Sequence, residues 1–272
     1  MAPPAGGTSW LRYRHLLRTN PEAPELITDF MGYNTYEPRR HGGMPRPNWV
    51  GDLLVECQVE VQQPTGTFTL ELSKGVDRFR ATWDLASGKC TLYHLGEKHT
   101  GRTAPDDSRF VELVSRPTQL RGKGKYHVRF ANIDDRLLVW VDDDLPFGDG
   151  AIYQPFTEKG PYGNDLQPAS IGVQGAALQV RKLVLWRDTY YTRDPNAGPD
   201  AVPADWVNPQ SWDDLRDLAP ATFYVQPGHY LCMGDNSPES SDGRSWGLVP
   251  ERLMLGRALV VYWPFNRAGR IK

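Results

Sequence analysis

Short segments in which apolar and polar residues alternate occupy most of the chain between about residue 26 and residue 192. Alternation with a period of two is typical of a half-buried β-strand, because successive side chains point to opposite faces. Turn residues such as Lys74-Gly75 and Gly122-Lys123-Gly124 separate the segments. The pattern therefore predicts a mainly β fold, an antiparallel sandwich. The predicted strands are 52–61, 67–72, 79–85, 89–95, 108–115, 125–132, 136–143, 169–174 and 177–188.

The last of these strands, ALQVRKLVLWRD, breaks the alternation near its middle. Leu178 and Val180 share one face at a period of two, but Leu183 and Leu185 fall on the other face. This pattern indicates either a central strand that is covered on both sides or a β-bulge near Lys182. We expect the strand to lie beside the first strand of the sandwich. We also expect its outer row to pack against a loop or the C-terminal segment.

The sequence changes character at about Asp194, where Pro, Asp and Ala become frequent. The run at 194–209 is typical of a linker or covering loop. Ser211 is a candidate N-cap for a short helix, because acidic residues follow in the first turn. Residues 221–235 then predict a strand, a Pro-Gly turn and a second strand, and residues 253–263 predict another strand pair.

The composition is that of a globular protein. Of the 272 residues, 39% are hydrophobic and 24% are charged. The net charge of −2 gives no indication of nucleic acid or an anionic membrane as a partner. Residues 1–9 lack the apolar core of a signal peptide, and the most apolar stretch, 253–265, is shorter than the roughly 20 residues of a membrane span. We expect the chain as given to have no membrane segment.

Neither a metal site nor a cofactor is predicted. The cysteines are far apart and form no C-x-x-C pair, and the histidines lack metal-ligand spacing. Each cysteine is most simply a small buried apolar residue. Asp142-Asp143-Asp144 is an acidic run that could bind a cation, but a solvated hairpin tip is the simpler interpretation. The three cysteines are Cys57, Cys90 and Cys232.

The stretch GDNSPESSDGRSWG, residues 234–247, concentrates residues that cap, turn and form hydrogen bonds. Asp242 and Arg244 are placed to form a charge-assisted bridge that pins a loop. Gly234 allows a close approach that other residues would prevent. A capped surface loop and a calcium loop are the alternatives. The calcium spacing is incomplete, because no central Gly follows the alternating oxygen ligands and no Glu occurs until Glu251.

The longer run GHYLCMGDNSPESSDGRSWGLVPERLMLGRA, residues 228–258, resembles the last sequence block of type I signal peptidases. The family pattern is roughly G-D-N-x-x-x-S-x-D-S-R-x-x-G, followed by Val-Pro and Gly-Arg-Ala. Gly243 departs from it, since the family usually has Ser there. The matching positions are Gly234, Asp235, Asn236, Ser240, Asp242, Arg244, Gly247, Val249, Pro250, Gly256, Arg257 and Ala258.

The resemblance implies a membrane-anchored serine endopeptidase that removes signal peptides from exported preproteins on the extracytoplasmic side of the cell membrane. In that family a Ser–Lys dyad cleaves the peptide bond, and the serine at the Ser240 position hydrogen-bonds the lysine, which must be neutral to act as a base. The resemblance thus assigns active-site support, and no cofactor, to this chain. The support residues are Gly234, Asp235, Asn236, Ser240, Asp242 and Arg244.

The catalytic dyad itself is not found in this sequence. The family's nucleophile lies in a Ser-Met-x-Pro run, and no Ser-Met pair occurs here. Its base lies in a Lys-Arg-x-x-x-x-Pro-Gly-Asp run. The segment RKLVLWRD with Lys182 is a superficial echo that lacks Pro-Gly-Asp and falls in a predicted strand. We expect this chain alone to be inactive.

The segments 124–147 and 169–192 resemble the closing strands of concanavalin A-like jelly rolls. This resemblance covers about residues 26–192 and implies two packed sheets, with a carbohydrate site on the concave face in some members. The alternative function is therefore a carbohydrate- or protein-binding module. Four tryptophans lie in strand-like sequence, where core packing is the default and one or two could stack on a sugar ring. They are Trp49, Trp83, Trp140 and Trp186.

Together the two resemblances predict three parts. Residues 1–25 would be a remnant of the peptidase domain, residues 26–192 an inserted jelly-roll sandwich, and residues 193–272 a β-rich signal-peptidase-like segment. The expected partners are signal peptides of exported preproteins in the full-length protein and a polysaccharide at the jelly roll, with no nucleic acid.

Overall fold

A computed structural model describes residues 7–18, 21–29, 49–101, 107–158, 160–189, 191, 222–234, 240–263, 265 and 268–270. The chain splits into two compact units. The first contains the described residues up to 189, and the second contains residue 191 and the described residues from 222 onward. The linker predicted at 194–209 and the helix predicted at Ser211 lie outside the described residues.

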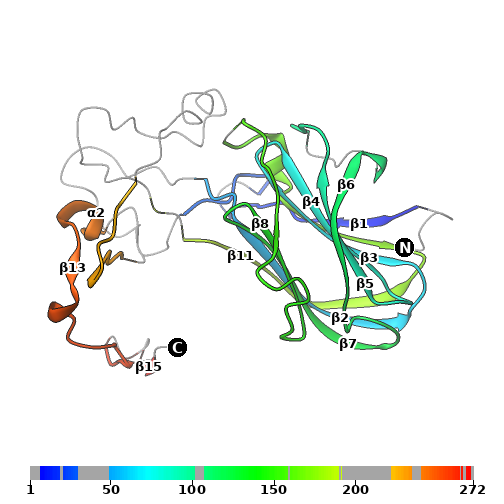
Figure 1. The fold of residues 1–272 in the computed structure, drawn as a ribbon. Helices are drawn as coiled ribbons and strands as arrows, with labels where there is room; N and C mark the ends of the chain where they lie inside the picture. The colour runs from blue at the N-terminus through cyan, green and yellow to red at the C-terminus, as the bar shows by residue number, and fades with distance from the viewer. Residues whose placement is uncertain are drawn as a thin grey trace. The chain divides into compact units, whose positions relative to one another are not determined.

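The first unit is a β-sandwich of a six-stranded and a five-stranded sheet (Figure 1). All neighbouring strands in both sheets are antiparallel, and the chain passes repeatedly from one sheet to the other. The six-stranded sheet has the order β1 (Ser9–Arg12), β10 (Ala169–Gln174), β3 (Thr67–Lys74), β4 (Asp77–Asp84), β5 (Lys89–Leu95) and β6 (Phe110–Pro117). The five-stranded sheet has the order β11 (Ala177–Arg187), β2 (Leu53–Gln63), β7 (Gly124–Ile133), β8 (Arg136–Val141) and β9 (Ala151–Ile152). This jelly-roll sandwich confirms the predicted fold class.

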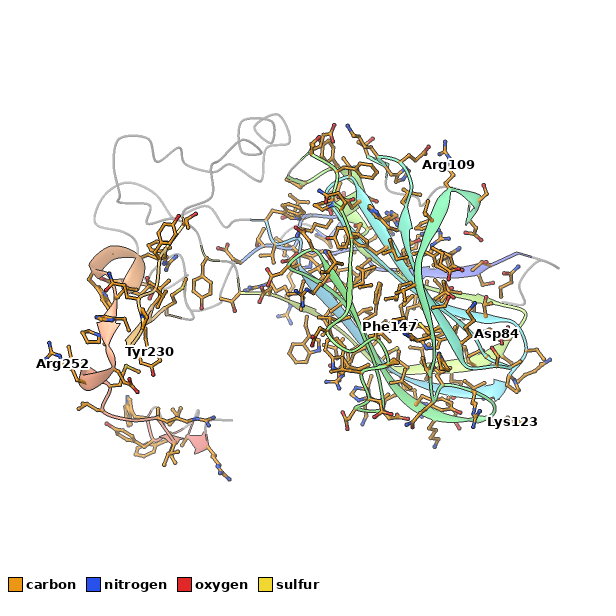
Figure 2. All side chains as sticks on the ribbon, viewed as in Figure 1. Asp84, Arg109, Lys123, Phe147, Tyr230 and Arg252 are labelled. Atoms are coloured by element: carbon orange, nitrogen blue, oxygen red, sulfur yellow. The ribbon has the colours of Figure 1, made fainter. Side chains whose placement is uncertain are left out.

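Apolar side chains between the two sheets form a single core, and side chains from both sheets fill the space between them (Figure 2). Phe68, Leu70 and Leu72 enter the core from β3, and Val55, Cys57 and Val59 enter it from β2. These positions are two residues apart on each strand. The alternation in the sequence is therefore the result of burying one face of each sheet.

The closing strand β11 lies beside β2, so the first and last predicted strands of the sandwich are neighbours, as expected. The register shifts between Arg181 and Val184, and Lys182 has a φ of 48°. This is the predicted β-bulge. The idea of a central strand covered on both sides is wrong, because β11 is an edge strand of its sheet.

The bulge accounts for the broken alternation. Leu178 and Val180 before it and Leu185 after it all pack against the core. The extra residue shifts the strand by one position, so apolar residues from both apparent rows reach the same face. The outer row is exposed at Val184 and Trp186, so the expectation that a loop of the sandwich covers these two side chains is wrong. Packing of this row against the C-terminal segment stays a prediction.

Residues 9–12, which we expected within a peptidase remnant, form β1 and complete the six-stranded sheet by pairing with β10. Trp10 lies opposite Gly172, and a Cβ atom at Gly172 would lie 2.8 Å from the indole ring. Glycine at this position therefore lets the indole lie directly on the sheet. The remaining domain boundaries stay predictions.

The cysteines of the sandwich are buried, as expected. Cys57 and Cys90 lie in the core, and burial raises the pKa of the Cys57 thiol to about 12. Cys232 in the second unit is half-buried, and all three thiols are free. None of these cysteines forms a disulfide.

The second unit consists of short elements. β12 (His229–Tyr230) pairs with β13 (Val249–Pro250), and β14 (Val260–Val261) pairs with β15 (Gly269–Arg270). The helix α2 (Gly243–Trp246) and the 3-10 helix η6 (Glu251–Leu253) lie in the same unit. Two more 3-10 helices, η2 (Asp107–Arg109) and η3 (Gly163–Leu166), belong to the sandwich. Within the described ranges, no helix is both long and apolar enough to pass through a membrane.

The predicted strand pairs of this unit are only partly correct. In 222–234 only β12 is a strand, and its partner is β13 rather than the residues before the Pro-Gly turn. In 253–263 only β14 is a strand, and it pairs with β15 beyond that stretch. Apolar runs mark extended backbone, but they do not specify which segment supplies the hydrogen-bonding partner.

Candidate functional site

The centre of the signal-peptidase-like segment is an ion pair. Arg244 donates from Nε to Oδ1 of Asp242 over 2.9 Å and from Nη2 to Oδ2 over 2.8 Å. The two side chains are only 3% and 5% exposed. Two parallel, charge-assisted hydrogen bonds fix both groups in one orientation. The predicted Asp242–Arg244 bridge is thus confirmed.

The Asp242 carboxylate also binds two backbone amides. Its Oδ2 accepts from the amide of Gly234 over 3.0 Å, and its Oδ1 accepts from the amide of Arg244 over 3.1 Å. The second contact makes Asp242 the N-cap of α2. The hydrogen bond from the Arg244 side chain, with both amides adding to it, outweighs burial and holds the pKa of Asp242 well below its usual range. The charged carboxylate therefore ties residue 234 to residues 242–244.

The hydroxyl of Ser240 lies directly against Gly234. A Cβ atom at Gly234 would lie 2.0 Å from Oγ of Ser240 and 2.9 Å from its Cβ. No other residue fits at Gly234 without moving the serine. Two contacts therefore hold the ends of the 234–242 loop together: the hydrogen bond to the Asp242 carboxylate and the close approach of Ser240 to Gly234.

The local packing explains why glycine is present at position 243, where the family pattern usually has serine. Its amide donates to the carbonyl of Cys232 over 2.7 Å. A Cβ atom at Gly243 would lie 2.8 Å from that oxygen and 2.8 Å from Cδ1 of Leu231. A side chain at position 243 would therefore collide with the backbone and side chain of 231–232 in this chain.

Of the predicted support residues, the structure brings together Gly234, Ser240, Asp242 and Arg244. Asp235 and Asn236 lie outside the described residues. One contact was missed, since the Arg244 guanidinium carbon lies 5.4 Å from the ring centroid of Tyr191. This distance is within the range of a cation–π contact. The two residues are more than 50 positions apart in the sequence, so no local signal points to the pair.

Lys182 does not have the surroundings of a catalytic base. It is an exposed residue at the bulge of β11, in the sandwich unit. A lysine that acts as a base must be desolvated, because burial is what favours its neutral form. In the structure, RKLVLWRD is part of the edge strand β11.

On the outer face of the six-stranded sheet, polar residues form a buried network. Glu71 accepts from Nη1 of Arg78 over 2.6 Å and from Nε of Arg80 over 2.8 Å. Nε of Arg78 also donates to Oδ1 of Asn164 over 2.5 Å. Burial lowers the pKa of Arg78. These groups bind each other and are closed to solvent, so their role is structural.

The four tryptophans of the sandwich differ in their burial. Trp83 is fully buried in the core, as the default interpretation expects. Trp186 is 54% exposed on the outer face of β11. Trp140 and Trp49 are half-buried, and Trp140 lies on β8 in the same five-stranded sheet as Trp186.

Sequence comparison relates the C-terminal part of the chain to signal peptidases. The family profile "Signal peptidase, peptidase S26" matches residues 171–263. A "Probable signal peptidase I-2" from Synechocystis is 38% identical over 69 residues, which is 24% of this chain and 32% of that protein. A "Signal peptidase I" from Leptolyngbya laminosa is 31% identical over 109 residues, 37% of this chain and 42% of that protein. The chain thus spans a third to two-fifths of these relatives, and the predicted resemblance of its C-terminal part is confirmed.

Structure comparison finds β-sandwich proteins with low scores. A carbohydrate-binding module from Bacillus subtilis has a TM-score of 0.36 at 14% identity, covering 50% of this chain and 74% of that one. The galectin LEC-6 from Caenorhabditis elegans has a TM-score of 0.33 at 11% identity, covering 55% and 92%. The architecture of the sandwich is defined by the strand order and register given above.

Proposed function

We propose that the C-terminal unit supplies the loop that supports the catalytic site of a type I signal peptidase, a serine endopeptidase that removes signal peptides. The observation that carries this proposal is the closed arrangement of Gly234, Ser240, Asp242 and Arg244. These residues match the family block in order and lie within contact distance of one another.

The geometry suits a support role. A base lysine must be held neutral and oriented, and a fixed hydroxyl can do this by hydrogen bonding to its amine. Ser240 is fixed because its Oγ lies against the Gly234 backbone, and that backbone is bound to Asp242. The Asp242–Arg244 pair thus acts through Ser240 rather than on the substrate.

The wider assignment follows the family. Its substrates would be the signal peptides of exported preproteins, and its place would be the extracytoplasmic face of the cell membrane. The nucleophile and the base would come from Ser-Met-x-Pro and Lys-Arg segments, which do not occur in this sequence.

A chimera tests the proposal. Residues 228–258 replace the matching block of the Leptolyngbya laminosa signal peptidase I, and cleavage of a preprotein is measured. If the block has the proposed role, kcat/KM stays within about tenfold of the parent enzyme. A second chimera with Asp242→Ala should lose cleavage. A correctly folded first chimera that does not cleave would refute the proposal.

A second candidate function, a carbohydrate-binding module, is favoured by the exposed tryptophan on the sandwich. More than half of the Trp186 side chain is exposed to solvent. It lies on the outer face of β11, whose inner face packs against the core. Large aromatic rings of this kind stack on sugar rings. The two functions are compatible, since they use different units of the chain.

A further inference from the structure

The structure assigns a glycan-binding strip to the outer face of the five-stranded sheet. The strip consists of Trp186, Glu56, His127, Arg129 and Trp140, and we call it the tryptophan strip. The inference rests on the second candidate function, and it names both the site and the ligand class, a chain of linked neutral sugar rings.

The strand register places the strip on one face. Val184 of β11, Glu56 of β2, Arg129 of β7 and Trp140 of β8 follow one another as direct cross-strand partners. Trp186 lies two positions further along β11, and therefore on the same face as Val184. The strip thus crosses four adjacent strands.

A hydrogen bond holds Trp186 in place at one end of the strip. Its indole Nε1 donates to Oε2 of Glu56 over 2.6 Å. The ring is thus fixed by one edge, while more than half of its surface remains exposed. A fixed aromatic surface loses little conformational entropy when a ligand stacks on it.

Glu56 joins Trp186 to the polar centre of the strip. Its Oε1 lies 2.7 Å from Nε2 of His127, which is 34% exposed. Although burial alone would raise it, the hydrogen bonds from Trp186 and His127 hold the pKa of Glu56 below its usual range. The carboxylate is therefore charged and keeps lone pairs for a further donor.

Trp140 forms the other end of the strip. The guanidinium carbon of Arg129 lies 5.2 Å from its ring centroid, a cation–π contact. Arg129 also donates from Nη2 to Oδ1 of Asp143 over 3.1 Å. The Arg129 side chain is 28% exposed. The guanidinium is thus held in place and still reaches solvent, where its remaining N–H groups can donate to a ligand.

The chemistry of the strip favours a glycan over an apolar protein surface. An apolar partner would bury the charges of Glu56 and Arg129 without replacing their water, which is costly. Sugar hydroxyls both donate and accept, so they can satisfy the carboxylate, the imidazole and the guanidinium together. The apolar faces of the same sugar rings can stack on the two indoles.

The spacing sets the size of the ligand. β11 and β8 are separated by β2 and β7, which is three strand spacings, or about 14 Å. One sugar ring cannot contact both tryptophans at that separation. A chain of several linked rings can, so oligosaccharides should bind much better than single sugars.

Affinity electrophoresis tests the inference. The full chain is run in native gels that contain hydroxyethyl cellulose, laminarin, glucomannan or dextran. We expect at least one polysaccharide to retard it, and Trp186→Ala and Trp140→Ala to weaken binding at least tenfold. Trp186→Phe keeps an aromatic ring and should retain most of the affinity. Free hexasaccharide should compete more strongly than the monosaccharide.

Trp246→Ala is the matched control, because Trp246 is 53% exposed but lies in the second unit. It should leave retardation unchanged, and near-UV circular dichroism should show that each variant is folded. If no polysaccharide retards the wild-type chain, both the binding function and the strip are wrong. If Trp186→Ala is retarded as strongly as the wild type, the binding function stands and this site is wrong.

Discussion

Single residues determine the geometry of the loop in the second unit. Asp242 accepts four hydrogen bonds on two oxygens, two from the side chain of Arg244 and two from backbone amides. Each oxygen binds a donor from the guanidinium and a donor from the backbone. Removing either member of the pair therefore leaves a nearly buried charge without its partner.

Arg244→Ala should destabilise the second unit by roughly 3–5 kcal/mol, because the buried Asp242 carboxylate loses its counter-charge. Thermal unfolding and hydrogen exchange of the Gly234 amide measure the effect. Arg252, labelled in Figure 2, is an exposed arginine of η6, and Arg252→Ala is the control. An Arg244→Ala variant with unchanged melting and unchanged exchange would contradict the structural role of the pair.

Gly234→Ala should open the loop, because its new methyl group would overlap Oγ of Ser240. The double variant Gly234→Ala/Ser240→Gly removes the overlapping atom and should recover part of the lost stability. A double-mutant cycle on unfolding free energies measures this coupling, which we expect to be about 1 kcal/mol or more. If the two substitutions are simply additive, the close approach does not constrain the loop.

At the scale of elements, the period of the sequence predicted most of the sandwich. Each strand buries one face, and the alternation of apolar and polar residues reflects this burial. The bulge at Lys182 was predictable because it breaks that period. The edge position of β11 could not be predicted, because apolar residues in both rows of a strand also fit a central strand that is covered on both faces. β1 was also missed, because four residues are too short to show a period and their partner β10 is distant in sequence.

The same reasoning applies to the candidate site. The Asp242–Arg244 pair was predictable from a spacing of two residues. The approach of Ser240 to Gly234 and the contact of Tyr191 with Arg244 depend on how the chain folds back, so no local pattern indicates them.

The loop of η3 gives the sandwich a pH-dependent stability. Asp165 is buried beside Ser73 and accepts from the amides of Tyr162 and Gly75 over 2.9 Å and 3.1 Å. Burial dominates and raises the pKa of Asp165 to about 7. The unfolded value is about 3.9, so the folded state binds the proton more tightly over this interval. The stabilising contribution of Asp165 is therefore fully present below about pH 4 and is lost as the pH rises toward 7.

Urea unfolding of the sandwich at pH 4, 5.5 and 7 measures this dependence. Asp165→Asn removes the titrating group and should flatten the profile between pH 4 and 7. Glutamates and histidines also titrate in this interval, but they are common to both proteins, so the difference between the two profiles isolates Asp165. A wild-type profile identical in shape to that of Asp165→Asn would contradict the assignment.

At the scale of the whole molecule, the two proposed functions belong to different units of the chain. The profile match at 171–263 begins within the sandwich and ends in the second unit, whereas the sandwich core comes largely from residues before it. The proposed support loop is present, but the Ser-Met-x-Pro and Lys-Arg-x-x-x-x-Pro-Gly-Asp segments are not in the sequence. Support residues alone do not supply a nucleophile.

The purified chain should therefore show no specific cleavage of a signal-peptide substrate. Incubation with a preprotein, followed by mass spectrometry of the products, measures this, and a signal peptidase I from one of the relatives serves as the positive control. Specific cleavage that is lost on mutating a residue of this chain would show that a catalytic group has been overlooked.

The most direct measurement of the central claim is preprotein cleavage by the chimera carrying residues 228–258, compared between Ser240→Ala and Ser241→Ala. Ser240 lies against Gly234, whereas its neighbour Ser241 is exposed. If Ser240 holds the base lysine, its loss removes a hydrogen bond to the catalytic group and should lower kcat/KM about 10- to 100-fold. Ser241→Ala should stay close to the parent chimera. Equal rates for the two variants would contradict the account.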